Sequence, residues 1–453
     1  MLSLQTNTPL STDDFVKWLA ERETAKVDWR IGTEHEKFLY HLDDLKPVAY
    51  EGPNGIGALL KALQAENNLT PIMEGDNIIG LKDADGGSIT LEPGGQFELS
   101  GAPLATVHET CAETARHLNQ MRSTTSALGL GMLGLGFQPI WDRDDISWMP
   151  KGRYRIMRNY MPQKGNLGLD MMLRSCTVQV NLDYADEVDM RRKFRTSLAL
   201  QPVATALFAN SPFKNGTPSG LKSTRAHVWT DTDPDRCGVP ECVFDPAFGY
   251  EQWIDYILDV PMYFLRRPHG YVDVSGLSFR DYMKGELLGF EGQFPTLEDF
   301  EDHITTAFPE VRLKGYLEMR GADGGSWANI CALPALWAGL LYDEQALSEA
   351  EHLAAEFTAQ DVMNARYSAS KDGLAGQIGS QDIHLIAKRM IEIAHAGLAR
   401  RGKLNAKSLD ETIYLKSLQT IVDSGMTNAD LMLAKYHQDW NEDVRQVYAH
   451  YHY

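Results

Sequence analysis

Alternating polar and apolar residues mark several short runs of the chain as strands with one polar face. In IGTEHEKFLY, residues 31–40, the alternation places Glu34 and Glu36 on one face and His35 and Lys37 on the other. Two carboxylates side by side on one face repel each other. Either a positive charge lies in front of them, or both face water.

Three further runs, LEPGGQFELS, CTVQVNLDY and YLEMRGADGG, repeat this pattern with acids, amides and an arginine. A solvated sheet face would also alternate, but it would carry more lysine, serine and threonine. The residues that the three runs place together are Glu92, Gln96, Glu98, Gln179, Asn181, Glu318 and Arg320. Two interpretations stay open at this point: a solvated sheet face, or a polar concavity that binds Mg²⁺ and substrate phosphates through oxygen ligands.

Helical periodicity predicts helices over residues 104–127 and 186–209, and an early helix from the N-cap Ser11 to about Glu23. Residues between that early helix and about Gly101 are rich in turn signals and strand-like runs. The glycine-rich SALGLGMLGLGFQPI has no strand–loop–helix context for a dinucleotide site, so we interpret it as a buried strand.

From about Ala335 the pattern becomes helix after helix, with Gly402 as a C-terminal cap. The expected fold class is α+β. We expect a single catalytic domain, residues 1–453, composed of an α+β body, 1–334, and a mostly helical C-terminal region, 335–453.

Composition and charge exclude some classes of function. The 453 residues are 43% hydrophobic and carry a net charge of −19, which argues against nucleic acid as a partner. The sequence has neither an unbroken apolar run of about 18 residues nor a secretory signal, so we expect no membrane association. Five scattered cysteines form no disulfide framework, and a reducing cytoplasm is the expected location.

Two basic segments, expected to be loops, suit an anionic substrate. KGRYRIMRNYMPQKG, residues 151–165, clusters Arg153 with four other cations, and STRAHVWTDTDPDRCG contains Arg225. Near a carboxylate-rich sheet, such clusters favour binding of a triphosphate or a carboxylate. The alternative is that several of these side chains are ordinary surface charges.

These motifs together resemble glutamate–cysteine ligase of the plant and proteobacterial type. The resemblance covers roughly residues 30–345 and rests on TEHEKF, EPGGQFELSGAP, RNYMP, LRSCTVQVNLD, STRAHVWTDTDPDRCG and FPEVRLKGYLEMRGADGG. It implies a glutamine-synthetase-like curved antiparallel sheet that forms a funnel. It also implies ATP-dependent joining of L-cysteine to the γ-carboxylate of L-glutamate, the first step of glutathione synthesis, in a monomer or homodimer.

The resemblance also implies roles for individual residues. Mg²⁺ would be held by Glu34, Glu36, Glu92, Glu98, Gln179 and Glu318. Catalysis would involve Arg320, Glu36 and Glu98, while Arg225, Asn181, Arg153 and Trp229 would bind substrate. ATP is the expected co-substrate.

Two rival functions fit parts of this pattern. One is an ATP-dependent carboxylate–amine ligase with a different amine acceptor. The other is a non-catalytic homologue, which would be expected to have lost the acids, whereas Glu34, Glu36, Glu98 and Glu318 are all present.

Overall fold

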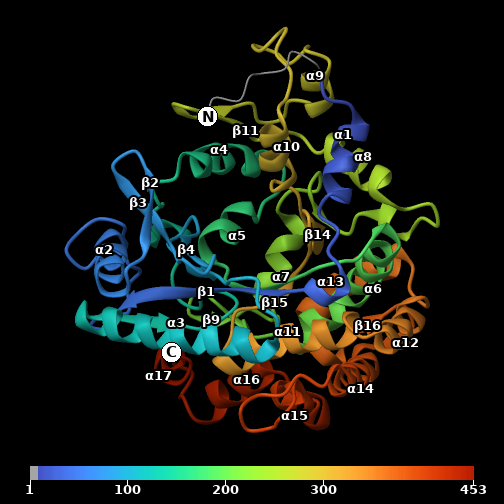
Figure 1. The fold of residues 1–453 in the computed structure, drawn as a ribbon. Coiled ribbons are helices and arrows are strands. Elements are labelled where there is room, and N and C mark those ends of the chain that lie inside the picture. The colour runs from blue at the N-terminus through green and yellow to red at the C-terminus, as the bar shows by residue number, and fades with distance from the viewer. Residues whose placement is uncertain (1–8) are drawn as a thin grey trace.

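A nine-stranded antiparallel sheet runs through the middle of the molecule, and a computed structural model describes it over residues 9–453 (Figure 1). The long strand β1 (Ile31–His41) pairs with β7 and β5 over its first half and with β6 near its end. On one side of β1, counted inward from the edge of the sheet, lie β14 (Val311–Leu313), β15 (Leu317–Asp323) and β7 (Thr177–Leu182). On the other side, counted outward, lie β5 (Phe97–Ser100), β4 (Ser88–Leu91), β3 (Asn77–Lys82) and β2 (Thr70–Glu74). The ninth strand, β6 (Leu130–Leu133), pairs with β1.

One face of this sheet is apolar and packs against helices α3 (Val107–Ala127), α6 (Glu187–Leu207) and α11 (Trp327–Leu341). Strand residues such as Val180 and Met319 are fully buried in this core. Burial of each large apolar side chain contributes roughly 1.5–3 kcal/mol. Polar and apolar residues therefore alternate in the sequence because only one face of each strand enters the core.

The remaining helices surround this core, and the last four along the chain lie together on the side of the sheet occupied by α3 and α11 (Figure 1). The remaining helices are α1 (Thr12–Ala20), α2 (Ile56–Asn67), α4 (Gly152–Tyr160), α5 (Gly168–Arg174), α7 (Thr224–Val228), α8 (Tyr250–Asp259), α9 (Phe279–Met283), α10 (Leu297–Ile304), α12 (Glu344–Ala354), α13 (Ala359–Asp372), α14 (Ile383–Arg401), α15 (Lys416–Ser424), α16 (Asn428–Gln438) and α17 (Gln446–His450).

Short two-stranded ladders complete the fold. They are β8 (Phe213–Lys214) with β9 (Thr217–Pro218), β10 (Cys237–Gly238) with β13 (Phe308–Pro309), β11 (Phe264–Arg267) with β12 (Gly270–Asp273), and β16 (Gln377–Ile378) with β17 (Gln381–Asp382).

Most of the predicted elements are present, and the α+β class is confirmed. Helices α3 and α6 lie within the predicted ranges, and the glycine-rich run contains the buried strand β6. The Asp14 carboxylate accepts the Ser11 N–H at 2.8 Å at the start of α1, which ends at Ala20 rather than near Glu23. Gly402 ends α14 in the left-handed conformation, with φ of 60°, as its position predicted.

Three segments differ from the prediction. Helix α2 lies in the stretch expected to be strands and turns, because Ile56, Leu59 and Leu63 bury one helical stripe. The two basic segments expected to be loops contain α4 and α7. In α4, Tyr154 and Ile156 are buried, so the segment gains apolar contacts by becoming helical.

The expected change of character at residue 335 falls inside α11, which begins at Trp327. This helix is apolar all round and packs between the sheet and α14, so it belongs to the core on both sides. Beyond it, helices dominate the chain, interrupted by the β16–β17 hairpin.

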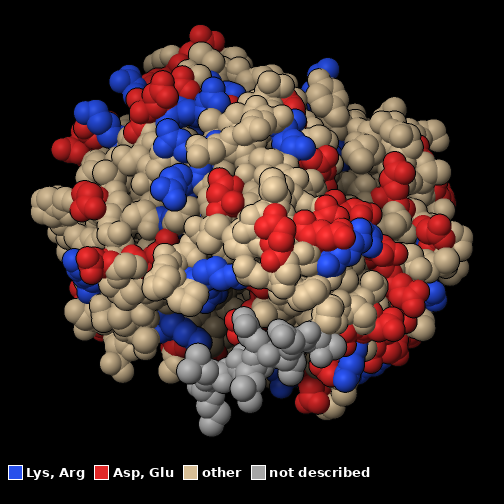
Figure 2. Space-filling view, turned by 90° about the horizontal axis from the view of Figure 1, so that it is seen from above, with Lys and Arg blue, Asp and Glu red and all other residues tan. Residues whose placement is uncertain are grey.

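The surface mixes both signs of charge. On the face shown in Figure 2, Lys and Arg side chains are interspersed among Asp and Glu. Within residues 9–453, no helix has both the length and the apolar character needed to span a membrane.

Candidate active site

Strand pairing brings the predicted polar residues onto one face of the sheet. Glu34 lies opposite Gln179 of β7, and Glu36 lies opposite Glu98 of β5. Residues directly opposite each other in an antiparallel ladder point to the same face. The same register continues outward, and its further members are Asn181, Glu318, Arg312, Thr90 and Ser100.

The carboxylates in the middle of this face have polar neighbours but no cationic partner. Across residues 9–453, no Lys, Arg or His side chain forms an ion pair with Glu34, Glu36, Glu92 or Glu98. Glu318, in contrast, forms ion pairs with three cationic side chains. Burial, followed by the charge of Glu318, raises the pKa of Glu34 to about 7. Burial, followed by the charges of Glu92 and Glu98, raises the pKa of Glu36 well above its ordinary value.

Hydrogen bonds orient three of these carboxylates, those of Glu34, Glu36 and Glu98. The Asn181 amide Nδ2 donates to Glu34 at 2.7 Å, and the Thr177 backbone N–H donates to Glu36 at 2.9 Å. Two hydroxyl groups donate to Glu98, from Thr90 at 2.5 Å and from Ser100 at 3.0 Å. These bonds leave carboxylate lone pairs free to bind a cation.

This donor set fits an open Mg²⁺ site. The donors are all oxygen atoms, and their mutual repulsion would be relieved by a cation in front of the sheet. Within residues 9–453, no three His, Cys, Asp or Glu side chains lie together so that they could hold a metal ion by themselves. Mg²⁺ does not need one, because it keeps several waters and shares substrate phosphates. The residues that would hold it are Glu34, Glu36, Glu92 and Glu98.

Glu318 and Gln179 do not fit the predicted role of metal ligand. Arg312 and Arg320 each contact the Glu318 carboxylate at 2.8 Å, and Lys314 contacts it at 3.1 Å. Burial alone would raise the pKa of Glu318, but these three cations hold it well below its ordinary value. The Gln179 carbonyl oxygen accepts from Arg320 at 2.8 Å. Both residues therefore orient Arg320.

A narrow pocket next to Arg320 contains the predicted substrate-binding residues Arg225 and Trp229, with Phe308 beside them. The Arg320 guanidinium carbon lies 5.9 Å from the Trp229 ring centroid and 5.8 Å from that of Phe308. Arg225 donates to the Arg320 backbone carbonyl at 2.7 Å. Within residues 9–453, its Nε and the Trp229 Nε1 are buried without a hydrogen-bond partner, as expected of donors that await a ligand.

A buried aspartate holds Arg225 in place. The Asp323 carboxylate accepts from the Ser223 hydroxyl at 2.6 Å and from the Ser211 hydroxyl at 2.7 Å. Ser223 is the N-cap of α7, the helix that carries Arg225. Burial lowers the pKa of Arg225, and the charges of Asp323 and Glu36 oppose that shift.

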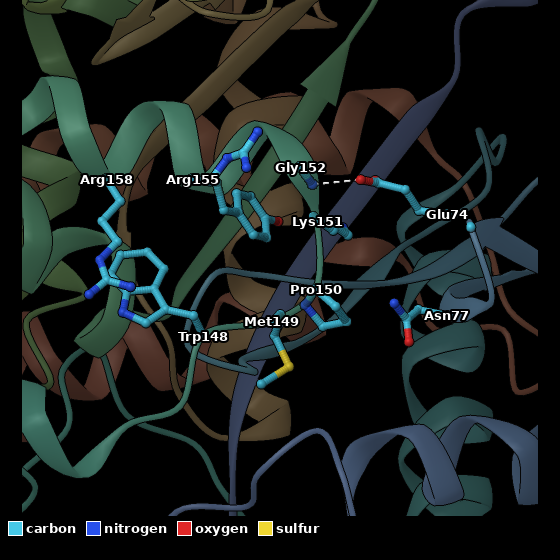
Figure 3. Close-up of a pocket in the computed structure, with 11 residues that line it drawn as sticks. Glu74, Asn77, Trp148, Met149, Pro150, Lys151, Gly152, Arg155 and Arg158 are labelled. Atoms are coloured by element: carbon cyan, nitrogen blue, oxygen red, sulfur yellow. Dashed lines mark hydrogen bonds between the residues drawn. The ribbon is translucent and has the colours of Figure 1, made fainter. Parts of the chain in front are cut away.

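A wider groove of about 590 Å³ lies between the β2–β3 hairpin and the start of α4. In Figure 3, Trp148, Arg155 and Arg158 lie on one side of it and Glu74 and Asn77 on the other. The Arg158 guanidinium carbon stacks 4.7 Å from the Trp148 ring centroid.

Two other cations connect this groove to the carboxylates. Lys151, which lines the groove, donates to the Leu91 carbonyl at 2.7 Å. Arg153 lies near Glu92: burial alone would lower the pKa of Arg153, but Tyr154 and Glu92 raise it. The groove, the carboxylates and the narrow pocket therefore follow one another along the polar face.

Several residues of this site were absent from the sequence prediction. Arg312 and Lys314 alternate in VRLKG and could have been found from this spacing, although β14 ends at Leu313 and Lys314 follows it. Asp323 gave no local signal, because its hydrogen-bond partners Ser211 and Ser223 come from a distant segment. Trp148 lies just before the basic segment that forms α4, and only the position of the groove gives it a role.

Comparison with known proteins decides the family. The sequence-family model of Glutamate-cysteine ligase family 2 (GCS2) matches residues 30–450 of the chain. The chain belongs to this family. It is 50% identical over 440 residues to the chloroplastic glutamate–cysteine ligase of Medicago truncatula, covering 97% of the chain and 85% of the relative. It is equally identical to that of Arabidopsis thaliana, covering 97% and 82%.

Two solved structures have a similar fold. A glutamate–cysteine ligase from Francisella tularensis in complex with AMP superposes with a TM-score of 0.56 at 12% identity, covering 95% of this chain and 90% of that one. A bifunctional glutathione synthetase from Pasteurella multocida superposes with a TM-score of 0.52 at 12% identity, covering 97% and 53%. At this identity the likeness concerns the fold alone.

Membership of the family confirms the predicted resemblance and the predicted ligase class. The predicted cytoplasmic location is wrong by the same comparison, since the relatives at about 50% identity are named as chloroplastic enzymes. Cysteine usage argued for a reducing compartment, and it does not distinguish one such compartment from another.

Proposed function

We propose that this ligase joins the γ-carboxylate of L-glutamate to the amine of L-cysteine, with cleavage of ATP, through a γ-glutamyl phosphate. The observation that carries the proposal is a row of carboxylates that form no ion pair across residues 9–453, with Glu36 and Glu98 buried and Glu34 and Glu92 half-buried. Pockets lined by Arg and Lys side chains lie on both sides of this row. A phosphoryl transfer between two anions needs this arrangement, with positive charge in front of the donor and acceptor oxygens.

The wider groove is the proposed site for ATP. Its volume of about 590 Å³ suits a nucleotide, and Lys151, Arg155 and Arg158 supply positive charge for phosphates. Trp148 offers a flat aromatic surface for the base. The phosphates would then point from the groove towards Glu92 and Glu98.

The narrow pocket is the proposed site for glutamate. Arg225 would bind a substrate carboxylate through its planar guanidinium group, for which its buried Nε is available. Trp229 and Phe308 would cover the methylene groups of the substrate. The side chains of this pocket would move apart on binding, since the pocket is narrow.

Mg²⁺ is the proposed metal, held by Glu34, Glu36, Glu92 and Glu98. When bound, it supplies positive charge that neutralises the carboxylates and the phosphates between them. Asn181 and Thr177 keep the carboxylates oriented.

The reaction has two steps in this proposal. A γ-carboxylate oxygen of glutamate attacks the γ-phosphorus of ATP, the bond to the ADP oxygen breaks, and ADP leaves. The cysteine nitrogen then attacks the acyl carbon, the bond to the phosphate oxygen breaks, and the amine loses a proton. Arg320, fixed by Glu318 and Gln179, would stabilise the transferring phosphoryl group.

We also infer that the chain acts as one catalytic domain. Arg366 of α13, in the helical C-terminal region, donates to the Trp229 carbonyl at 3.1 Å and so supports the wall of the glutamate pocket. Separating the C-terminal helices would remove this support.

ADP release tests the proposed function directly. The purified chain is assayed with Mg²⁺, ATP, glutamate and cysteine, and each is omitted in turn. Full turnover is expected only with all four. A panel of amines in place of cysteine tests the acceptor, and faster product formation with another amine would contradict cysteine as the acceptor.

A further inference from the structure

One acidic side chain, Glu310, lines the narrow pocket together with two arginines and two aromatic rings. We propose that Glu310 accepts the α-ammonium group of the glutamate substrate, so that the pocket recognises both charges of a free α-amino acid. The proposal rests on the proposed function and assigns the residue that selects for the amino group.

Backbone hydrogen bonds fix the position of Glu310. It lies between β13 and β14, where its N–H donates to the Gly238 carbonyl at 2.8 Å. Its own carbonyl accepts the Arg320 N–H at 3.1 Å. Glu310 is therefore tied to the residue that we place at the transferring phosphoryl group.

Arg366 holds the Glu310 side chain in one orientation. The Arg366 Nε donates to Glu310 Oε1 at 2.6 Å, and these side chains are 10% and 15% exposed, respectively. The second Glu310 oxygen has no hydrogen-bond partner within residues 9–453. Because the carboxylate is paired on one oxygen only, its second oxygen has acceptor capacity for a ligand.

The chemistry of the pocket matches an α-amino acid. A guanidinium group suits the α-carboxylate, a carboxylate suits the ammonium group, and aromatic rings cover methylene groups. A ligand without the amino group would leave the second Glu310 oxygen without a partner in the pocket. Sites built to bond a substrate group discriminate strongly against analogues that lack it.

The test compares L-glutamate with glutarate, which has both carboxylates and lacks the amino group. ADP release with Mg²⁺, ATP and cysteine gives KM for glutamate, and inhibition of that reaction gives Ki for glutarate. In the wild-type enzyme, Ki for glutarate is expected to exceed KM for glutamate by on the order of 10²-fold. In Glu310→Gln this ratio is expected to fall at least about tenfold, through a higher KM for glutamate, with Ki for glutarate nearly unchanged.

Two further variants keep the result interpretable. Glu241→Gln, at an exposed carboxylate that is not among the residues lining the pocket, is expected to leave the ratio unchanged. Glu310→Asp keeps the charge but shortens the side chain, and it is expected to lower the ratio less than Glu310→Gln does. If Glu310→Gln gives no turnover, Glu310→Asp decides, and an unchanged ratio in that variant would overturn the proposal.

A structural role for Glu310 predicts a different outcome. If the residue only supports the pocket, Glu310→Gln weakens glutamate and glutarate equally, and the proposal fails. Failure of the proposed function is distinguishable, because the wild-type chain would then release no ADP with glutamate and cysteine.

Discussion

Removing the charge of Glu34 is expected to stabilise the metal-free protein while it weakens catalysis. Glu34 lies on the polar face beside Gln179, and burial raises its pKa to about 7. In Glu34→Gln the neutral side chain can still accept the Asn181 amide hydrogen bond. The variant therefore removes the half-buried charge and keeps the local geometry.

The sign and size of the effect follow from this pKa. Since the folded-state pKa of about 7 is above the ordinary value of 4.5, the folded protein holds a proton between these two pH values that the unfolded chain has lost. Stability contributed by this group is full below pH 4.5 and falls as the pH rises to about 7. A shift of this size corresponds to about 3 kcal/mol at most. Because Glu34 is partly accessible and titrates together with its neighbours, we expect about 1–3 kcal/mol.

Denaturant unfolding measures the prediction. The wild-type chain, Glu34→Gln and the exposed control Glu241→Gln are unfolded in urea with EDTA at pH 5 and pH 8. At pH 8 the Glu34→Gln variant is expected to be more stable than the wild type by about 1–3 kcal/mol. At pH 5 this difference should be much smaller.

Mg²⁺ adds the second part of the test. Saturation at 100 times the dissociation constant stabilises the wild type by about 2.7 kcal/mol, and the variant should gain less. A variant that is no more stable than the wild type in EDTA at pH 8, together with equal effects of Mg²⁺ on both, would refute the reasoning that the carboxylates await a cation.

Three further predictions concern turnover. Glu36→Gln is expected to lower kcat by on the order of 10²-fold at saturating Mg²⁺, by analogy with the loss of one preorganised charge-stabilising group, and near-normal turnover would contradict its role. Arg225→Lys, which keeps the charge but loses the planar fork, should raise KM for glutamate much more than KM for ATP, and equal rises would count against the pocket assignment. Trp148→Ala should raise KM for ATP about tenfold through lost stacking with little change for glutamate, and the opposite pattern would place the nucleotide elsewhere.

The sequence by itself determined which residues share a face. Side chains alternate in any strand, so the spacing of Glu34 and Glu36 already placed them together before any partner strand was known. The periodicities of α3 and α6 are equally local, which is why both helices lie within their predicted ranges. Local motifs also carried the resemblance to the ligase family.

The tertiary structure decided what those faces meet. Glu36 lies opposite Glu98 because β1 and β5 pair in one register, a choice made by burial of the whole apolar face. Glu318 forms ion pairs with Arg320, with Arg312 of the neighbouring strand and with Lys314 of the turn that follows that strand. Only the pairing of the strands brings Arg312 and Lys314 to its carboxylate.

Contacts between distant segments account for the rest of the site. Glu310 and Arg366 are 56 residues apart, and no local pattern links them. Helix α4 forms in a segment whose charges favoured a loop, because its tyrosines gain burial only once the core is assembled. Period and composition act within a few residues, whereas counter-ions and pocket walls come from packing of the complete chain.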